Sequence, residues 1–292
     1  MPGRIVVGID GSPHSADALE WAIARATLGG GSLELINAYD AQADVHFYGY
    51  HSVASPQPIE WLKEHSRELL EAAMAHVREL APDLDCKATS AVGPAAYVLG
   101  KASQGADAVV VGRRGLGAAA SAVLGSVSNR LSVEAACPVV VVGEGPAPES
   151  GPIVVGVDDS EFGVAALRYA ASEAALRGTS VRAVTAYQAT DGRGVSDPEL
   201  AARMRAELEA EAHDIITRAL AAIGEQAVSV EPIAVEGRRP AEAILEHAED
   251  ARLIVVGTHG KGLIRRVLLG SVSRQVLSDA DRPVALVDLP ER

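Results

Sequence analysis

The chain has 292 residues, enough for two domains of modest size, and 48% of them are hydrophobic although few are aromatic. Its formal net charge of −13 argues against nucleic acid or an anionic membrane surface as the main partner. The longest apolar runs are strand-sized and too short to span a bilayer, and the first residues lack the pattern of a secretory signal, so we expect a cytoplasmic protein.

Strand and helix patterns alternate along the first half of the chain. Residues 4–9 form a short β-branched run typical of a buried strand, and Ser12 followed by Pro13 predicts the start of a helix. The further elements predicted in this half are a strand over 32–38, a long helix over 59–80, a strand over 86–92, a short helix from 94, a strand over 108–112, a helix from 125 and a strand over 139–142.

The long helix over 59–80 is predicted from the spacing of its apolar residues. Leu62, Leu69, Ala73, Val77 and Leu80 recur near a period of 3.6 residues, which is typical of an amphipathic helix with one face on a core.

An internal repeat decides the architecture. Residues 5–12 (IVVGIDGS) recur as residues 153–160 (IVVGVDDS) at an offset of 148, and residues 124–128 (LGSVS) recur as 269–273 at an offset of 145. The smaller second offset predicts a net insertion in the first copy, in or near the loop over 40–58.

The second half repeats the order of elements, with its long helix over about 197–223. Residues 143–150 are rich in Gly, Pro and Glu and are predicted to be a linker, which gives a first domain over 1–143 and a second over 151–292. Strands that alternate with helices need crossover connections, so each half is predicted to be an α/β domain with five mostly parallel strands and helices on both faces. In such sheets ligands bind beyond the carboxyl ends of the strands, at the switch point of the strand order.

A glycine pattern follows the fourth predicted strand of each half. Gly112 and Gly115 are followed by nine residues and then by Gly125 and Ser126, and the second half repeats this spacing with Gly257, Gly260, Gly270 and Ser271. Glycine lets a backbone approach a ligand closely, and the amides at the start of the next helix attract anions. Ser128 and Ser273 add hydroxyl groups beside those amides. The pattern predicts a phosphate site; the alternative is that these are turn glycines and that Ser126 and Ser271 only cap helices.

Asp10 and Asp158 end the first strand of each half, on the same predicted edge. Each carboxylate could accept hydrogen bonds from ribose hydroxyls or join a hydrated Mg²⁺, and an Asx-turn or helix-cap role is the alternative. Basic residues flank the two glycine patterns, and solvated surface positions account for most of them: Arg113, Arg114, Lys261, Arg265 and Arg266. His259 is interpreted as a loop residue, because Arg114 stands at the equivalent place. Cys86 and Cys137 have no CxxC spacing and are expected to be buried free thiols.

These residues resemble the universal stress protein family over nearly the whole chain. ATP-binding members of that family carry the pattern G-x2-G-x9-G-[ST], which residues 112–126 and 257–271 both fit. The V-G-x-D-x-S opening of each half and the closing runs CPVVVV and RPVALV are also similar to the family. The resemblance implies two tandem Rossmann-like domains, similar to adenine-nucleotide α-hydrolases, that bind ATP at the carboxyl edge of each sheet, with Mg²⁺ as a candidate companion ion.

Carried over by position, the resemblance implies a set of ATP-binding residues in each domain. In the first domain they are Gly8, Asp10, Ala38, Gly112, Gly115, Gly125, Ser126, Val127 and Ser128. In the second they are Gly156, Asp158, Ala186, Gly257, Gly260, Gly270, Ser271, Val272 and Ser273. The aspartates would lie near ribose and adenine, the alanine backbones would contact the adenine edge, and the remainder of each set would surround the phosphates. The resemblance also implies that residues 139–142 and 284–287 pair within one chain as an internal pseudo-dimer, with a homodimer expected beyond it.

The leading functional hypothesis is an ATP-binding stress or regulatory protein with little or slow hydrolysis, because the chain has no GxxxxGK[ST] loop. A second hypothesis is an α-hydrolase-type enzyme that adenylates a substrate, against which the S-G-G-x-D-S loop of such enzymes is missing after the first strand. The chain could also be a nucleotide-free dimerisation scaffold, or it could bind a cyclic nucleotide in place of ATP. The more basic first glycine loop, with Arg113 and Arg114, predicts that the two sites differ in affinity.

Overall fold

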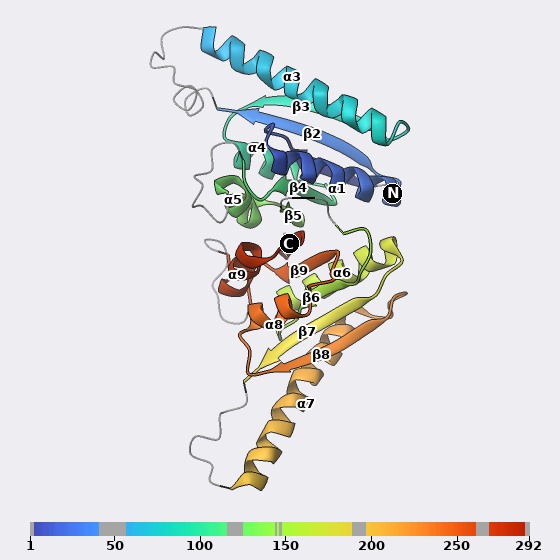
Figure 1. Ribbon diagram of the computed structural model, residues 1–292, viewed down its shortest axis with the longest axis vertical. Helices are drawn as coiled ribbons and strands as arrows, with labels where there is room; N and C mark the ends of the chain where they lie inside the picture. The colour runs from blue at the N-terminus through green and yellow to red at the C-terminus, as the bar shows by residue number, and fades with distance from the viewer. Residues whose placement is uncertain are drawn as a thin grey trace. The chain divides into compact units, whose positions relative to one another are not determined.

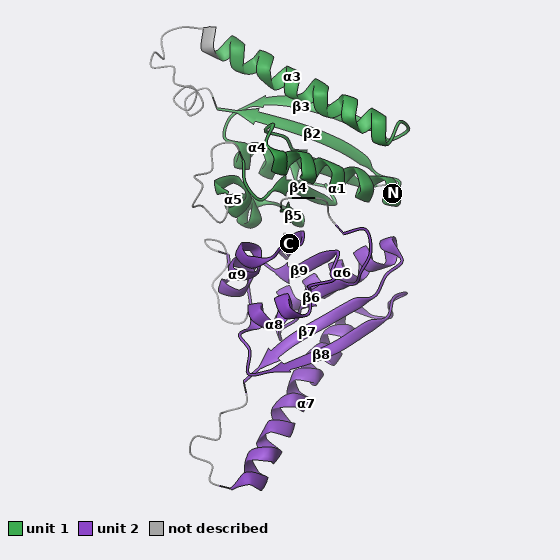
Figure 2. Ribbon diagram, viewed as in Figure 1, with its two compact units in different colours: residues 1–147, 290–292 green, residues 148–289 purple. Residues whose placement is uncertain are grey.

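The computed structural model describes residues 3–40, 57–115, 125–143, 145, 148–188, 197–260 and 269–289 (Figure 1). The chain divides into two compact units, one of residues 1–147 with 290–292 and the other of residues 148–289 (Figure 2). Each unit has its own set of parallel strands and its own helices. Most of the loop in which the insertion of the first copy was expected lies outside the described residues.

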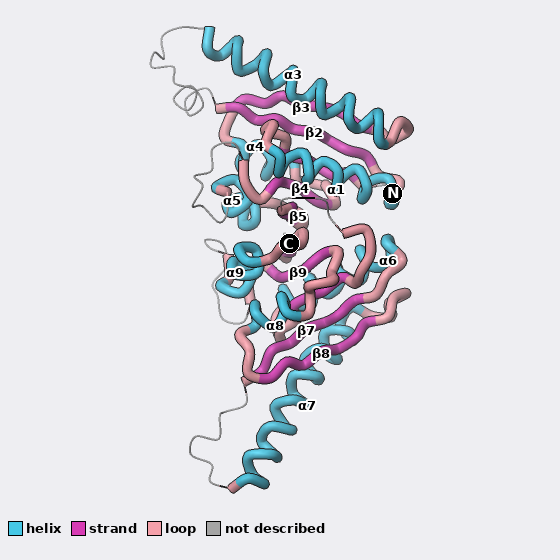
Figure 3. Tube along the Cα trace, in the orientation of Figure 1, coloured by secondary structure: helices cyan, strands magenta, loops and turns pink. Residues whose placement is uncertain are grey.

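The first unit alternates strands and helices in the predicted order (Figure 3). Its elements are β1 (Arg4–Gly8), α1 (Pro13–Gly29), β2 (Ser32–Tyr39), α3 (Gln57–Leu80), β3 (Cys86–Val92), α4 (Ala95–Ala102), β4 (Ala108–Gly112), α5 (Ser126–Glu134) and β5 (Val139–Val142). The five strands are parallel and lie in the order β3-β2-β1-β4-β5. Helices α1 and α3 pack together on one face, and α4 and α5 pack together on the other.

The second unit repeats this plan. Its elements are β6 (Ile153–Gly156), α6 (Glu161–Arg177), β7 (Val181–Tyr187), α7 (Pro198–Ile223), β8 (Val230–Glu236), α8 (Pro240–Glu246), β9 (Leu253–Gly257), α9 (Ser271–Asp279) and β10 (Val284–Val287). The parallel strands within this unit lie in the order β8-β7-β6-β9-β10. Both units therefore confirm the α/β fold class, and the strand order switches direction at β1–β4 and at β6–β9.

Local sequence explains where the first helix of each unit begins and ends. The hydroxyl of Ser12 accepts a hydrogen bond from the amide of Ser15 at 3.2 Å, and Pro13 occupies the first helical position. Gly30 ends α1 in the left-handed conformation, with φ of 59°, which a residue without a Cβ adopts at little cost. Ser160 and Gly178 repeat these two roles around α6.

The central strands form the core because helices cover both of their faces. Val6, Val7, Val109 and Val110 are fully buried, as the uninterrupted β-branched runs predict for parallel strands. Hydrophobic burial of this kind contributes roughly 25 cal/mol for each Å² of apolar surface removed from water. The core therefore fixes the sheet, and the loops at its carboxyl edge are left to form a site.

The burial of α3 and of the cysteines differs from a simple reading of the sequence pattern. In α3 the side chain of Leu80 is 53% exposed, because the last helical turn is exposed, and Leu69 is only half-buried. The face on the sheet carries Ser66 and Leu70 instead. The two cysteines are free thiols as expected, but both are half-buried rather than buried.

Candidate nucleotide-binding sites

The first strand of each unit ends in an aspartate whose carboxylate helps to shape the following turn. Oδ1 of Asp10 accepts a hydrogen bond from the amide of Ser12 at 2.9 Å, and Oδ1 of Asp158 accepts one from the hydroxyl of Ser160. The bond of Asp10 is the Asx-turn weighed as an alternative to ligand binding, whereas that of Asp158 joins it to the side chain that caps the next helix. A carboxylate oxygen can accept more than one hydrogen bond, so the two roles are compatible.

The second oxygen of each aspartate lies against a glycine of the strand-four loop. A Cβ placed on Gly115 would collide with Oδ2 of Asp10, and a Cβ on Gly260 would lie 2.7 Å from Oδ2 of Asp158. In the first unit the hydroxyl of Ser12 also donates to the carbonyl oxygen of Arg114 at 3.4 Å. The loop after β1 and the loop after β4 therefore meet at the switch point of the sheet, and glycine is needed there because a side chain would fill the space.

The loop after β4 folds back so that the next helix begins beside the strand exit. The amide of Gly125 donates to the carbonyl oxygen of Arg113 at 3.0 Å, and the amide of Gly270 donates to that of Thr258 at 2.9 Å. Gly125 and Gly270 are the N-cap residues of α5 and α9, without a side-chain cap, so the helices begin at Ser126 and Ser271. The first-turn amides and the positive end of each helix dipole thus lie at the carboxyl edge, where they suit an anion.

The side chains within this turn have different roles. Ser126 and Ser271 are exposed at the helix start, whereas Ser128 and Ser273 are buried. The Ser128 hydroxyl donates to the carbonyl oxygen of Gly125 at 3.1 Å, and that of Ser273 donates to the carbonyl oxygen of Gly257 at 2.6 Å. The two buried serines hold the loop to the helix in this structure. Val127 and Val272 are half-buried between them.

Gly8 and Gly156, which the family pattern places in the site, have a packing role. They are the last residues of β1 and β6, and a Cβ on Gly8 would lie 3.0 Å from Leu99 of α4. A Cβ on Gly156 would collide with Ile244 of α8. Both glycines therefore allow a helix to pack closely beneath the site.

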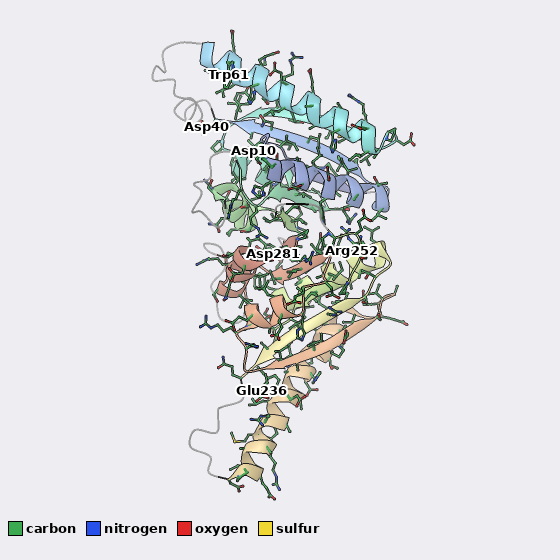
Figure 4. All side chains as sticks on the ribbon, in the orientation of Figure 1. Asp10, Asp40, Trp61, Glu236, Arg252 and Asp281 are labelled. Carbon is green, nitrogen blue, oxygen red and sulfur yellow. The ribbon has the colours of Figure 1, made fainter. Side chains whose placement is uncertain are left out.

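Ala38 and Ala186 stand one residue before the ends of β2 and β7, next to the central strand of each sheet. Ala38 pairs with Ala91 of β3, and Ala186 pairs with Val235 of β8. Figure 4 shows Asp10, Asp40 and Trp61 at one end of the first unit, where β1 and β2 finish and α3 begins. The alanine backbones thus lie on the same edge of the sheet as the aspartates.

Two buried polar side chains that sequence reasoning missed anchor this edge. The Asn37 amide donates to the carbonyl oxygen of Ile9 at 2.6 Å, and the Thr185 hydroxyl donates to that of Val157 at 2.8 Å. Asn37 and Thr185 occupy equivalent positions of the repeat, and each holds the peptide group directly before the site aspartate. A polar residue within an apolar strand was the available signal, since buried polar groups are nearly always hydrogen-bonded.

The two strand-four loops carry different side chains. In the first unit the guanidinium of Arg113 lies beside Gly143 at the end of β5, and Arg114 is half-buried. In the second unit His259 is buried, its Nδ1 lies 3.1 Å from the hydroxyl of Thr258, and its ring centroid lies 5.2 Å from that of Phe162. Of the other flanking cations, Lys261, Arg265 and Arg266 lie outside the described residues.

Clusters of metal ligands and long apolar helices would indicate other kinds of binding. Across the described ranges, no group of three or more His, Cys, Asp or Glu side chains is placed to hold a metal ion. Nor does any helix in the part of the chain that the structure describes have the length and apolar character to cross a membrane.

Comparison with solved structures places the fold. A universal stress protein from Archaeoglobus fulgidus matches 99% of this chain and 99% of its own, with a TM-score of 0.70 and 20% sequence identity. Another from the same organism, in complex with dAMP, is 30% identical and matches 47% of this chain and 98% of its own, with a TM-score of 0.32. The first match shows that the whole tandem chain adopts a fold of this class.

Sequence comparison is more specific. The model of the universal stress protein family matches residues 1–143 and again residues 150–288. The universal stress protein Rv1996 of Mycobacterium tuberculosis is 33% identical over 98% of this chain and 95% of its own length. The motifs, the repeated fold and these matches agree: this chain is a tandem-domain member of the universal stress protein family.

Proposed function

We propose that each unit binds ATP at the carboxyl edge of its sheet and that nucleotide occupancy regulates the shape or the partners of the protein. The observation that carries this proposal is the contact between Asp10 and Gly115, repeated between Asp158 and Gly260. In each unit a carboxylate lies against a glycine of the strand-four loop, and the amide of Gly125 or Gly270, directly before the next helix, donates to the same loop.

The chemistry of the site fits a nucleotide. The carboxylate of Asp10 can accept hydrogen bonds from ribose hydroxyls, and the first-turn amides of α5 can donate to phosphate oxygens. Phosphate groups in turn recruit Mg²⁺, which protein sites usually hold through one or two carboxylates and the phosphates themselves. Asp10 is the residue of the first unit that would complete such a shell, and the bound ion would offset phosphate charge.

Holding a nucleotide fits the residues better than rapid hydrolysis. Efficient phosphoryl transfer needs groups that position the attacking water and stabilise the transferring phosphoryl group. The sequence has no GxxxxGK[ST] loop to supply a phosphate-binding lysine of that type. We therefore propose that the protein hydrolyses ATP slowly or not at all. We also propose that it is located in the cytoplasm. A cyclic nucleotide is the second candidate ligand, since the same anion site can accept one phosphate.

The deciding experiment is mass spectrometry of nucleotide released from gently purified protein, followed by calorimetric titration with ATP, AMP and cyclic AMP. We expect ATP to be recovered and to bind with the highest affinity of the three. If cyclic AMP bound more tightly than ATP, cyclic AMP would be the ligand in place of ATP. Rapid ATP turnover with Mg²⁺ would overturn the regulatory role. Absence of any nucleotide binding would refute the proposed function.

We further propose that two chains associate as a homodimer. A chain of 30.2 kDa would then have twice that mass by light scattering. A monomer mass at micromolar concentration would contradict the homodimer, and cell fractionation would test the location.

A further inference from the structure

One stripe of α3 faces the elements that form the nucleotide site. A Cβ placed on Gly11, next to Asp10, would lie 2.8 Å from Leu69. Two turns later, Nε2 of His76 lies 3.4 Å from the carboxylate of Glu20 on α1. Leu69 and His76 are seven residues apart and therefore lie on the same side of the helix. This side of α3 faces α1 and the turn that holds Asp10.

The same stripe carries two aromatic rings toward the start of α3. Trp61 and His65 precede Leu69 by eight and four residues, which is the spacing of neighbours on one helix face. Their rings stack with centroids 5.2 Å apart and planes 6° apart. At 1.5 Å per residue, His65 stands about 6 Å and Trp61 about 12 Å along the helix beyond Leu69. The pair therefore lies further along α3 than the Asp10 turn, and Figure 4 shows Trp61 and Asp10 toward the same end of the first unit.

The equivalent helix of the second unit can be aligned by its buried face. Buried residues with the same spacing are Ser66, Leu70 and Ala73 in α3 and Ala212, Ile216 and Ala219 in α7. In α7, Arg218 pairs with Asp159, the repeat equivalent of Gly11, at 3.5 Å, so this helix also faces the turn that holds the site aspartate, one helical turn beyond Ile215.

In that alignment the aromatic pair has acidic counterparts. Glu207 stands where the first unit has Trp61, Glu211 where it has His65, and Ile215 where it has Leu69. Both glutamates are exposed. Further carboxylates lie nearby: partial burial and then the charges of Glu209 and Glu236 raise the pKa of Tyr187 at the end of β7. The second unit therefore offers carboxylates where the first offers stacked rings.

We propose that Trp61 and His65 contact the base of the nucleotide in the first unit and make this unit the tighter adenine-nucleotide site. The proposal rests on the proposed function and adds to it which unit binds more tightly and through which side chains. Every base has a π-face, and aromatic side chains stack on it. Trp61 is 41% exposed, so part of this residue is accessible to a ligand.

The test exploits the tryptophan content of the chain. Trp21 and Trp61 are its two tryptophans, and Trp21 is buried. ATP should quench the fluorescence of Trp61, whereas inorganic tripolyphosphate, which has no base, should bind without quenching it. Trp61→Ala should weaken ATP binding to the first unit by about 5- to 150-fold, the range that base–aromatic stacking covers. Trp61→Phe should recover most of this loss, and Glu207→Ala, at the matched position of the second unit, should leave the first unit's affinity unchanged.

The outcomes separate the two proposals. Unchanged ATP affinity in Trp61→Ala would overturn this inference while ATP binding by the unaltered chain still supports the proposed function. An equal loss of affinity for tripolyphosphate, or no recovery in Trp61→Phe, would show that Trp61 acts on the fold and not on the base, and would also overturn it. Failure of the unaltered chain to bind adenine nucleotides would refute the proposed function itself.

Discussion

Replacing Gly115 by alanine tests the site at its closest contact. The added Cβ would collide with Oδ2 of Asp10, whose other oxygen is held by the amide of Ser12 at 2.9 Å. Gly115 is not among the glycines with positive φ, so alanine meets no backbone strain there. The carboxylate has to rotate to make room, and this rotation is the perturbation.

The geometry sets different magnitudes for folding and for binding. A side chain displaced from its rotamer costs about 0.5–1.5 kcal/mol, which limits the loss of folding stability. A displaced carboxylate no longer faces the ribose, and hydrogen bonds to charged groups contribute about 1.5–3 kcal/mol each. Since about 1.4 kcal/mol corresponds to a tenfold change in Kd, ATP binding to the first unit should weaken by about 10- to 150-fold.

Calorimetric titration with ATP and thermal unfolding measure the two quantities on the same samples. Gly260→Ala should act on the second unit in the same direction, more mildly, because its Cβ would lie 2.7 Å from Asp158 Oδ2. Gly100→Ala is the matched control: its Cβ would meet no atom nearer than 3.8 Å, so it should leave binding unchanged and stabilise α4 slightly. A Gly115→Ala, Gly260→Ala double variant that binds ATP as tightly as the unaltered chain would refute the site.

Three further predictions concern groups around the sites. Thr185→Val removes the 2.8 Å hydrogen bond to the carbonyl oxygen of Val157 and should lower the free energy of unfolding by about 1–3 kcal/mol in urea titration; an unchanged midpoint would contradict the anchoring role. Glu173→Ala removes a fully buried carboxylate 3.2 Å from the buried Arg177 guanidinium and should cost about 3–5 kcal/mol by the same assay, whereas a neutral effect would show that this ion pair contributes little. Burial raises the pKa of the Cys137 thiol to about 12, so this thiol stays protonated at pH 8. In the folded protein it should therefore react with a disulfide reagent roughly 10³-fold more slowly than in the protein unfolded by urea. Equal rates in the two states would contradict a buried environment for this thiol.

The sequence alone was enough to predict the repeat, the order of elements and the position of the glycine patterns. These features are local: β-branched runs mark buried parallel strands, Ser12 with Pro13 marks a helix start, and the spacing from Gly112 to Ser126 is read along one stretch of chain. Prediction was weaker for α3, where the helical spacing of apolar residues included Leu80, which is exposed in the structure. The buried serine at position 66, which exchanges a hydrogen bond with Ser90 of β3 at 2.7 Å, carries no hydrophobic signal.

The tertiary structure alone decided which residues meet. Asp10 and Gly115 are far apart in the sequence and come together because β1 and β4 are neighbours in the sheet, and neighbouring strands are chosen by packing and not by local periodicity. The same holds for Asn37 of β2, whose amide donates to the carbonyl oxygen of Ile9 at the end of the neighbouring strand β1. It holds also for Leu69 of α3, whose side chain lies against Gly11, next to Asp10. Sequence spacing predicted a nucleotide site after the fourth strand, and the order of strands determined which carboxylate and which helix face lie near that loop.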